Sequence, residues 1–209
     1  MGAAVELTDH GQKLFSARRL EQVFNDCFAV SENTRLVGGA MEPLYRPAGE
    51  GQEYNLLIYR EDFFASALHE IAHWSIAGKE RRQLLDFGYW YAPEGRSPEQ
   101  QRAFEAVEVK PQALEWFFSR ACDYRFRVSV DNFNDESGEI PDTSDFLGEV
   151  LAQAKRWQQH GIPPRADQFY RALCAEFSTA TAAPALNFTR EELDCPTSRW
   201  RFSCKPAAR

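Results

Sequence analysis

The stretch FFASALHEIAHWSIAG, residues 63–78, decides the fold prediction for this chain. Its apolar residues recur with helical spacing, which predicts a buried helix from Phe63 to Ala77. Gly78 is typical of a residue at which a helix stops, and the basic residues after it favour a helix C-terminal end: Lys79, Arg81 and Arg82. We therefore expect a core helix that also carries polar side chains.

The same helix contains two of the four histidines, in the HExxH pattern His69-Glu70-Ile71-Ala72-His73. Residues four apart lie one above the other on a helix, so both imidazoles can point at one metal ion. The alternative is a pair of core histidines satisfied by hydrogen bonds, which is costly for two imidazoles one turn apart in an apolar helix. The spacing therefore predicts a metal centre at His69 and His73.

Two imidazoles need a third ligand. The pattern HExxHxxGxxH is excluded, because the chain has Ile76 where this pattern needs Gly and Lys79 where it needs His. We expect the two other histidines, His10 and His160, to face solvent. A carboxylate from a later helix therefore remains, which gives a site of two histidines and one carboxylate.

The carboxylate candidates lie in FEAVEVKP, residues 104–111. Glu105 and Glu108 are three residues apart, so both can face one way on a helix. We favour Glu108, because it immediately precedes a break expected at Pro111 and an apolar turn, which favours its burial. Glu105 is the second candidate, as a ligand or as a hydrogen-bond partner of an imidazole.

The remaining carboxylates near the motif have other expected roles. In a zinc hydrolase Glu70 takes a proton from water at the metal, and in an iron site it relays protons or only packs. The motif is compatible with both Zn(II) and Fe(II), because both ions accept two imidazoles and a carboxylate. We assign Glu99 and Glu115 to a solvated charged face, and we expect Asp86 to support an imidazole.

Periodicity and turn residues predict the other elements. Ser16 is expected to cap a helix that ends near Phe28, and Ser97-Pro98 to start a helix that Pro111 ends or kinks. Further helices are expected at 112–121, 146–160 and 166–177, strands at 34–37, 55–59 and 126–130, a turn at Gly38-Gly39, a strand or ordered loop at 86–91 and an exposed acidic loop at 131–145.

Several helices with a few short strands predict an α+β domain. The chain has 209 residues, 44% of them hydrophobic, which is enough for one core that buries roughly 70% of the unfolded surface. We expect a loosely ordered N-terminal segment at 1–15, one domain at 16–178 and a C-terminal tail at 179–209, where Ala, Thr, Pro and Arg are frequent.

Charge and cysteine content exclude several classes of protein. The chain has 24 Lys and Arg against 31 Asp and Glu, so we expect no direct nucleic-acid partner, because phosphate binding needs clustered cations. No apolar run reaches the length of about 18 residues that a membrane span needs, and the N-terminus lacks the regions of a secretion signal. Five widely spaced cysteines without a CxxC pair are typical of a reduced, cytoplasmic protein.

Five stretches together resemble the bacterial elongation factor P hydroxylases over about residues 20–177. They are Asn33-Thr34-Arg35-Leu36, Glu42-Pro43-Leu44-Tyr45, FFASALHEIAHWSIAGKERR at 63–82, DFGYWY at 86–91 with Pro93, Gly95 and Arg96, and FEAVEVKPQALEW at 104–116. The combination is far more specific than HExxH alone.

The resemblance implies an enzyme that adds a hydroxyl group to a lysine of translation elongation factor P, usually after that lysine has been β-lysylated. It implies that residues 16–178 form a metal-dependent hydroxylase domain, nearer to HExxH metalloproteins than to the double-stranded β-helix oxygenases. Its metal ligands map onto His69 and His73, with a glutamate that we place at Glu108. We expect Fe(II), with Zn(II) as the alternative, and molecular oxygen as co-substrate.

The sequence does not support 2-oxoglutarate as a co-substrate. None of the four histidines begins an HxD or HxE triplet, so the facial triad of the 2-oxoglutarate dioxygenases is absent. The substrate carries ammonium charge, and acidic side chains around the cleft would capture it. The candidates are Asp131, Asp135, Glu136 and Glu139, unless they belong to a solvated loop.

Two rival functions remain from the residues alone. A zinc peptidase would use Glu70 as its base and would need no oxygen. An adaptor would use the metal only to stabilise the fold. Two further groups have alternative expected roles. Either a pocket is lined, or the core is filled, by the aromatic side chains of Phe87, Tyr89, Trp90 and Tyr91. Either an acidic partner is bound, or a helix end is only complemented, by the basic side chains of Lys79, Arg81 and Arg82.

Overall fold

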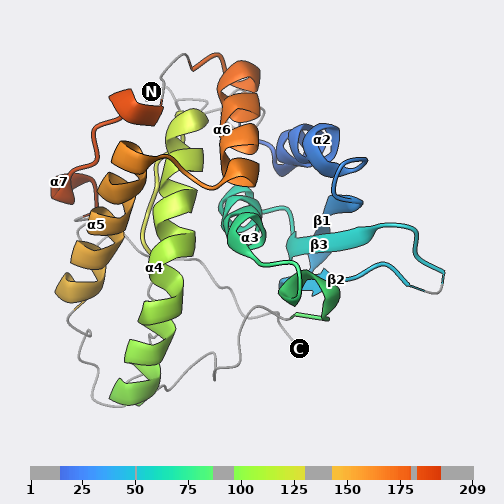
Figure 1. Cartoon of the computed structure of the whole chain (residues 1–209), viewed down its shortest axis with the longest axis horizontal. Coiled ribbons are helices and arrows are strands. Elements are labelled where there is room, and N and C mark those ends of the chain that lie inside the picture. Colours follow the sequence, from blue (N-terminus) through green and yellow to red (C-terminus); the bar gives the residue numbers. More distant parts are fainter. Residues whose placement is uncertain (1–14, 50, 87–96, 130–142, 180–182, 194–209) are drawn as a thin grey trace, which may run out of the picture.

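The computed structural model describes residues 15–49, 51–86, 97–129, 143–179 and 183–193. Within these ranges the fold is α+β, as the sequence predicts, with a three-stranded sheet beside a group of helices (Figure 1). The elements in chain order are α2 (Ala17–Phe28), β1 (Thr34–Ala40), β2 (Leu44–Arg46), β3 (Asn55–Arg60), α3 (Phe64–Ile76), η1 (Arg81–Gln83), α4 (Pro98–Ala121), α5 (Ser144–His160), α6 (Pro164–Glu176), η2 (Ala183–Ala185) and α7 (Arg190–Leu193).

The sheet has the strand order β1-β3-β2. β1 runs parallel to β3, and β2 runs antiparallel to β3. Helix α2 packs against β1, and α3 packs against β3. The short strand β2 was missed from the sequence, because three residues are too few for an alternating pattern to stand out.

The glycines of β1 correct one of our predictions. We expected Gly38-Gly39 to form a turn, but β1 continues through both residues to Ala40. The pairing with β3 shifts in register between Val37 and Ala40, and Gly39 has φ of 96°. A Cβ at Gly38 would lie 2.6 Å from the ring of Tyr59. The two glycines therefore allow an irregularity and a close approach inside a strand.

Helix α3 lies at the centre of the fold, between the sheet and α4 (Figure 1). Leu68 and Ile71 are fully buried, and Trp74 is 2% exposed. The helix ends one residue before the predicted Ala77. At that end the Arg165 side chain of α6 donates to the carbonyls of three residues of the last turn, Trp74, Ser75 and Ala77. These bonds satisfy carbonyl groups that the helix itself leaves without partners.

Helix α4 corrects the break expected at Pro111. It begins as predicted, with a capping box between Ser97 and Gln100 and with Pro98 in its first turn, but it continues through Pro111 to Ala121. A proline inside a helix costs about 3 kcal/mol, whereas burial of one large apolar side chain contributes roughly 1.5–3 kcal/mol. Four such side chains follow Pro111 and are at most 1% exposed: Leu114, Trp116, Phe117 and Phe118. Packing therefore outweighs the local cost.

Residues 124–129 also differ from prediction, since the strand expected at 126–130 does not form in the described part of that range. Phe126 instead stacks on Trp116, with ring centroids 5.6 Å apart. The backbone N–H and C=O of Ser129 bond to the side chain of Gln112, at 3.1 and 2.8 Å. A glutamine side chain therefore takes the place of a neighbouring strand.

The other helices agree with prediction within two residues at each end, and α5 is followed by Gly161 with φ of 91°. Ser16 does precede α2, but its side chain makes no capping hydrogen bond.

We predicted a tail after residue 178, yet Leu186, Phe188 and Leu193 are buried in the core. The division of the chain into segments stays a prediction, and residues 1–14 and 194–209 lie outside the described ranges. None of the described helices combines the length and the apolar content needed to cross a bilayer.

Candidate metal centre

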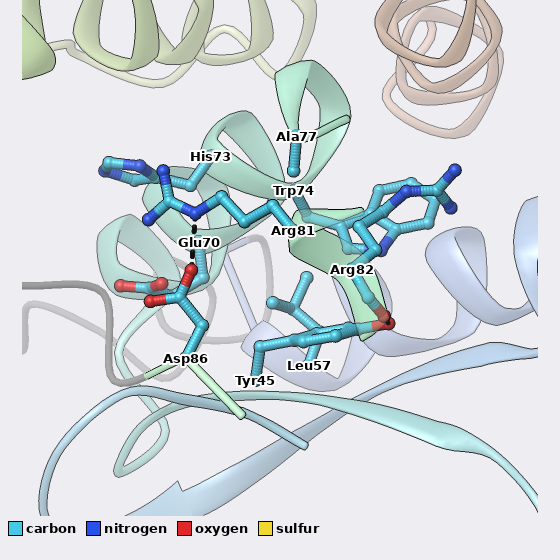
Figure 2. Close-up of a pocket in the computed structure, with 9 residues that line it drawn as sticks. All are labelled: Tyr45, Leu57, Glu70, His73, Trp74, Ala77, Arg81, Arg82 and Asp86. Atoms are coloured by element: carbon cyan, nitrogen blue, oxygen red, sulfur yellow. Dashed lines mark hydrogen bonds and ion pairs between the residues drawn. The ribbon is translucent and has the colours of Figure 1, made fainter. Parts of the chain in front are cut away.

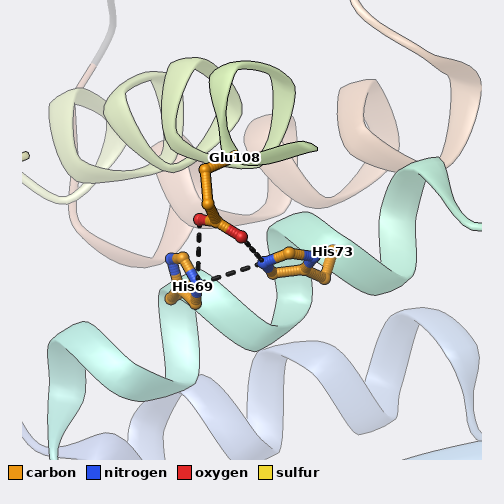
Figure 3. A group of neighbouring side chains, drawn as sticks. All are labelled: His69, His73 and Glu108. Carbon is orange, nitrogen blue, oxygen red and sulfur yellow. Dashed lines mark hydrogen bonds and ion pairs between the residues drawn. The ribbon is translucent and has the colours of Figure 1, made fainter. Parts of the chain in front are cut away.

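Two helices bring three ligand-type side chains together. His69 and His73 lie one turn apart on α3 and face α4, which presents Glu108 to them (Figure 3). The Nε2 atoms of the two histidines are 3.1 Å apart. The Glu108 carboxylate lies 3.6 Å from His69 Nε2 through Oε2 and 3.1 Å from His73 Nε2 through Oε1. These are the three residues that the sequence analysis named.

The arrangement fits a metal ion. Ligand atoms that each lie about 2.1 Å from one ion are roughly 3.0–3.5 Å apart for right-angled to tetrahedral geometry, and the three separations are 3.1, 3.1 and 3.6 Å. Glu108 is fully buried, and its Oε1 makes no hydrogen bond of good geometry within the described structure, although His73 Nε2 lies 3.1 Å from it. A buried carboxylate oxygen without a hydrogen bond is costly, and a cation would compensate for it.

The electrostatics of the site also favour a cation. Burial alone would lower the pKa of His69, but the charge of Glu108 and the hydrogen bond with Glu115 outweigh it and raise this pKa to about 10. Burial alone would raise the pKa of Glu108, but His73 and His69 outweigh it and lower this pKa to about 2. The site therefore stabilises positive charge beside an ionised carboxylate.

Glu115 corrects a prediction, since we had assigned it to a solvated face. It is 8% exposed, and its Oε2 lies 2.9 Å from His69 Nδ1. Glu115 follows Glu108 by seven residues, so both lie on one face of a helix that continues through Pro111. The seven-residue spacing was the sequence signal for this contact, and the expected break at Pro111 hid it.

Gln112 makes a hydrogen bond to the Glu108 carboxylate. Its Nε2 donates to Glu108 Oε2 at 3.2 Å and to the Ser129 carbonyl at 2.8 Å. Gln112 is fully buried, and the Ser129 N–H donates back to its Oε1. The amide is thus bonded on both sides, which restricts the orientation of the Glu108 carboxylate.

Glu70 is not part of this group but lines a pocket beside it. Figure 2 shows Glu70 and His73 in a pocket of about 40 Å³, together with Tyr45, Leu57, Trp74, Ala77, Arg81, Arg82 and Asp86. Glu70 is 7% exposed, and burial raises its pKa. A cavity needs about 10–15 Å³ to hold one water molecule, so this pocket has room for a few molecules of that size.

Two basic side chains that line the pocket are held by ion pairs. Arg81 Nε donates to Asp86 Oδ2 at 2.5 Å (Figure 2), and Arg82 donates to Glu32 at 2.6 Å. We expected Asp86 to support an imidazole, but its carboxylate accepts this bond from Arg81 and its backbone bridges to Tyr45. The prediction that these arginines meet a partner is not tested by these contacts.

The other candidate residues do not join the group. Glu105 is half-buried and accepts a hydrogen bond from Gln101, one turn before it. Glu99 and His160 are exposed, as expected. The remaining candidates lie outside the described residues: His10, the aromatic residues at 87–91 and the acidic residues at 131–139.

Comparison with known proteins gives the same family as the motifs. The family model described as "Elongation factor P hydroxylase" matches residues 23–187. A protein of Haemophilus influenzae named "Elongation factor P lysine hydroxylase" is 52% identical over 157 residues, which cover 75% of this chain and 86% of that protein. The resemblance inferred from the motifs is thereby confirmed, and the chain belongs to the elongation factor P hydroxylase family.

Proposed function

We propose that this protein is a metal-dependent hydroxylase that adds a hydroxyl group to the β-lysylated lysine of elongation factor P, in the cytoplasm. Family membership supports the reaction class, and the name of the relative supports the protein substrate. The observation that carries the metal dependence is the meeting of two imidazole nitrogens and the fully buried Glu108 carboxylate, at separations that suit the ligands of one ion.

His69, His73 and Glu108 would hold the metal ion, which we expect to be Fe(II). A set of two imidazoles and one carboxylate suits Fe(II), and a bound Fe(II) ion would supply the activation of molecular oxygen that a hydroxylation needs. Three protein ligands leave coordination positions open, which distinguishes a catalytic from a structural site. The same donors accept Zn(II), so the metal must be identified by experiment rather than by ligand type.

Glu70 would handle protons next to the metal. It occupies the pocket that His73 also lines, and burial raises the pKa of its carboxyl group. A carboxyl group beside a metal ion can accept and release a proton during a reaction, and a raised pKa favours its holding one. We therefore assign to the carboxyl group of Glu70 the holding of a proton beside the metal.

The charge of the pocket suits the proposed substrate. Its described lining carries Glu70 and Asp86, and the latter is already paired with Arg81. This leaves Glu70 as the acidic group of the lining to which we assign attraction of the ammonium charge of a lysyl arm. The pocket of about 40 Å³ has room for a molecule of the size of oxygen beside Glu70.

The decisive experiment is a reaction of the purified protein with β-lysylated elongation factor P, Fe(II), air and an added reductant such as ascorbate, with the intact mass of the factor measured afterwards. The reductant supplies the two electrons that turn the second oxygen atom of O2 into water when the first is inserted. We expect a gain of one oxygen atom, and no gain without iron, without oxygen or with His73→Ala. A cleaved factor and full activity with Zn(II) under nitrogen would instead establish the peptidase. An unchanged factor under all conditions would contradict the proposal.

A further inference from the structure

Glu115 is a positioning residue of the metal centre, we infer, because it holds His69 in the tautomer and ring orientation that leave Nε2 free for the metal. This inference rests on the proposed metal centre but not on the identity of the substrate. Nothing in the HExxH pattern points to Glu115, which lies 46 residues after His69.

The geometry separates the two nitrogens of the His69 ring by role. Nδ1 lies 2.9 Å from Glu115 Oε2, while Nε2 lies 3.1 Å from His73 Nε2 and 3.6 Å from Glu108 Oε2. Nε2 therefore faces the ligand group, and Nδ1 faces the carboxylate that supports it. An imidazole that donates from one nitrogen to a carboxylate presents the lone pair of the other nitrogen to a metal.

The burial of Glu115 makes this contact specific. The residue is 8% exposed although it carries a carboxyl group, and buried charges are rare unless they are paired. The hydrogen bond with His69 provides that pairing. Removal of either side chain would leave the other one buried without its hydrogen-bond partner.

Helix α4 fixes the position of Glu115 relative to Glu108. The helix is unbroken between them, and Gln112 stands one turn after Glu108 with a hydrogen bond to it. One face of α4 therefore presents three functional side chains in register: the ligand Glu108, the amide of Gln112 that orients it, and the carboxylate of Glu115 that orients His69. A shift of the helix would disturb all three contacts.

A proton on Nε2 of His69 instead of Nδ1 would exclude the positioning role of Glu115. If Glu115 were protonated and donated to Nδ1, the neutral ring would carry its remaining proton on Nε2 and could not bind a metal there. Nitrogen chemical shifts of the ring distinguish the two tautomers directly.

The test uses Co(II) alone as the probe, with no substrate, and compares three variants of the full chain. Glu115→Leu removes the acceptor, Glu115→Gln keeps an acceptor oxygen without the charge, and Glu105→Gln removes a charge elsewhere on α4. We expect Glu115→Leu to weaken Co(II) binding by about 10–100-fold, as for other partners of ligating histidines. Glu115→Gln should recover part of that loss, and Glu105→Gln should bind as the wild type does.

Two further measurements distinguish this positioning role from a purely structural role of Glu115, which would leave both unchanged. The visible spectrum of bound Co(II) should change in Glu115→Leu, and the histidine nitrogen spectrum of the Zn(II)-loaded wild type should show a proton on Nδ1 of His69. Equal Co(II) affinity and an unchanged spectrum in Glu115→Leu would overturn the inference. If Glu115→Leu does not fold, weaker Co(II) binding and an altered visible spectrum in folded Glu115→Gln, with Glu105→Gln unchanged, support the role of the charge. Unchanged binding and spectrum in Glu115→Gln, or a wild type with the proton on Nε2, overturn the inference.

These outcomes are separable from the fate of the proposed function. A wild type that binds Co(II) as described but does not hydroxylate elongation factor P contradicts the function and leaves the role of Glu115 intact. A Glu115→Leu variant with normal metal binding contradicts only that role. A wild type that binds no Co(II) contradicts both.

Discussion

Helices α3 and α4 contribute to the same centre in different ways. α3 supplies two ligand-type side chains four residues apart, His69 and His73, so a single helical turn defines both positions. α4 supplies one ligand-type side chain and two supports over two turns, Glu108, Gln112 and Glu115. The contribution of α3 is local in the sequence, whereas that of α4 depends on an unbroken helix held by the core.

This difference has consequences for robustness. Any helix that contains the HExxH spacing presents two imidazoles on one side, whatever surrounds it. The face of α4 exists only because packing of its C-terminal half outweighs the cost of Pro111. We therefore expect changes in α3 to remove ligands outright and most changes in α4 to alter how well a remaining ligand is held.

The largest effect is expected from α3. His69→Ala or His73→Ala leaves only two of three protein ligands, so metal affinity should fall by more than about 100-fold, beyond what loss of a supporting residue costs. Metal content after dialysis and competition with a chelator measure the change. Full metal content in either variant would remove the assignment of the centre.

Two glutamates of α4 provide the matched comparison. Glu108→Ala should lose metal nearly as completely as the histidine variants, because it removes the third ligand and its negative charge. Glu105→Ala should keep metal affinity within about twofold, since its carboxylate is half-buried and bonded to Gln101 instead. The reverse order in the same binding assay would show that the wrong carboxylate was chosen.

Protons should compete with the metal in a defined direction. Because the pKa of His69 in the metal-free protein is raised from 6.5 to about 10, its imidazole is protonated at neutral pH and must lose that proton when metal binds. Affinity for Zn(II) should therefore rise about tenfold per pH unit above pH 6.5, and binding should release about one proton. Calorimetry in buffers with different ionisation enthalpies measures the release. Affinity independent of pH in this range would show that His69 is already neutral.

The smallest effect is expected at Pro111. Pro111→Ala restores a helical N–H, so the free energy of unfolding should rise by about 1 kcal/mol, less than the full proline penalty because contacts of the ring are lost and the unfolded chain gains freedom. Metal affinity should change by less than about threefold, since packing already keeps α4 in register. Denaturant unfolding and Co(II) titration measure both quantities. A large loss of affinity would mean that the proline itself aligns Glu108 with His69 and His73.

The local parts of this protein were predictable from the sequence. The bounds of α3, the start of α4 at Ser97-Pro98 and the two imidazoles one turn apart follow from patterns within a few residues. The structure places Glu108, and not Glu105, beside His69 and His73, in agreement with the burial expected for it from the sequence. Its role as a ligand stays a prediction until metal binding is measured.

Contacts between distant residues were not predictable in the same way. Glu115 looks like a surface charge in the sequence, and only the packing of α4 against α3 turns it toward His69. Residues 126–129 look like a strand, but the side chain of Gln112 satisfies the backbone at Ser129. Leu186 and Phe188 look like part of a flexible tail, yet the core buries them.

The sequence by itself determined that this chain has a core helix with two imidazoles one turn apart and that it resembles the elongation factor P hydroxylases. Helical periodicity and motif identity are local properties, so they need no knowledge of the rest of the chain. The tertiary structure decided which carboxylates meet those imidazoles, because the balance between a proline penalty and the burial of a long helix is settled only when the whole core is packed.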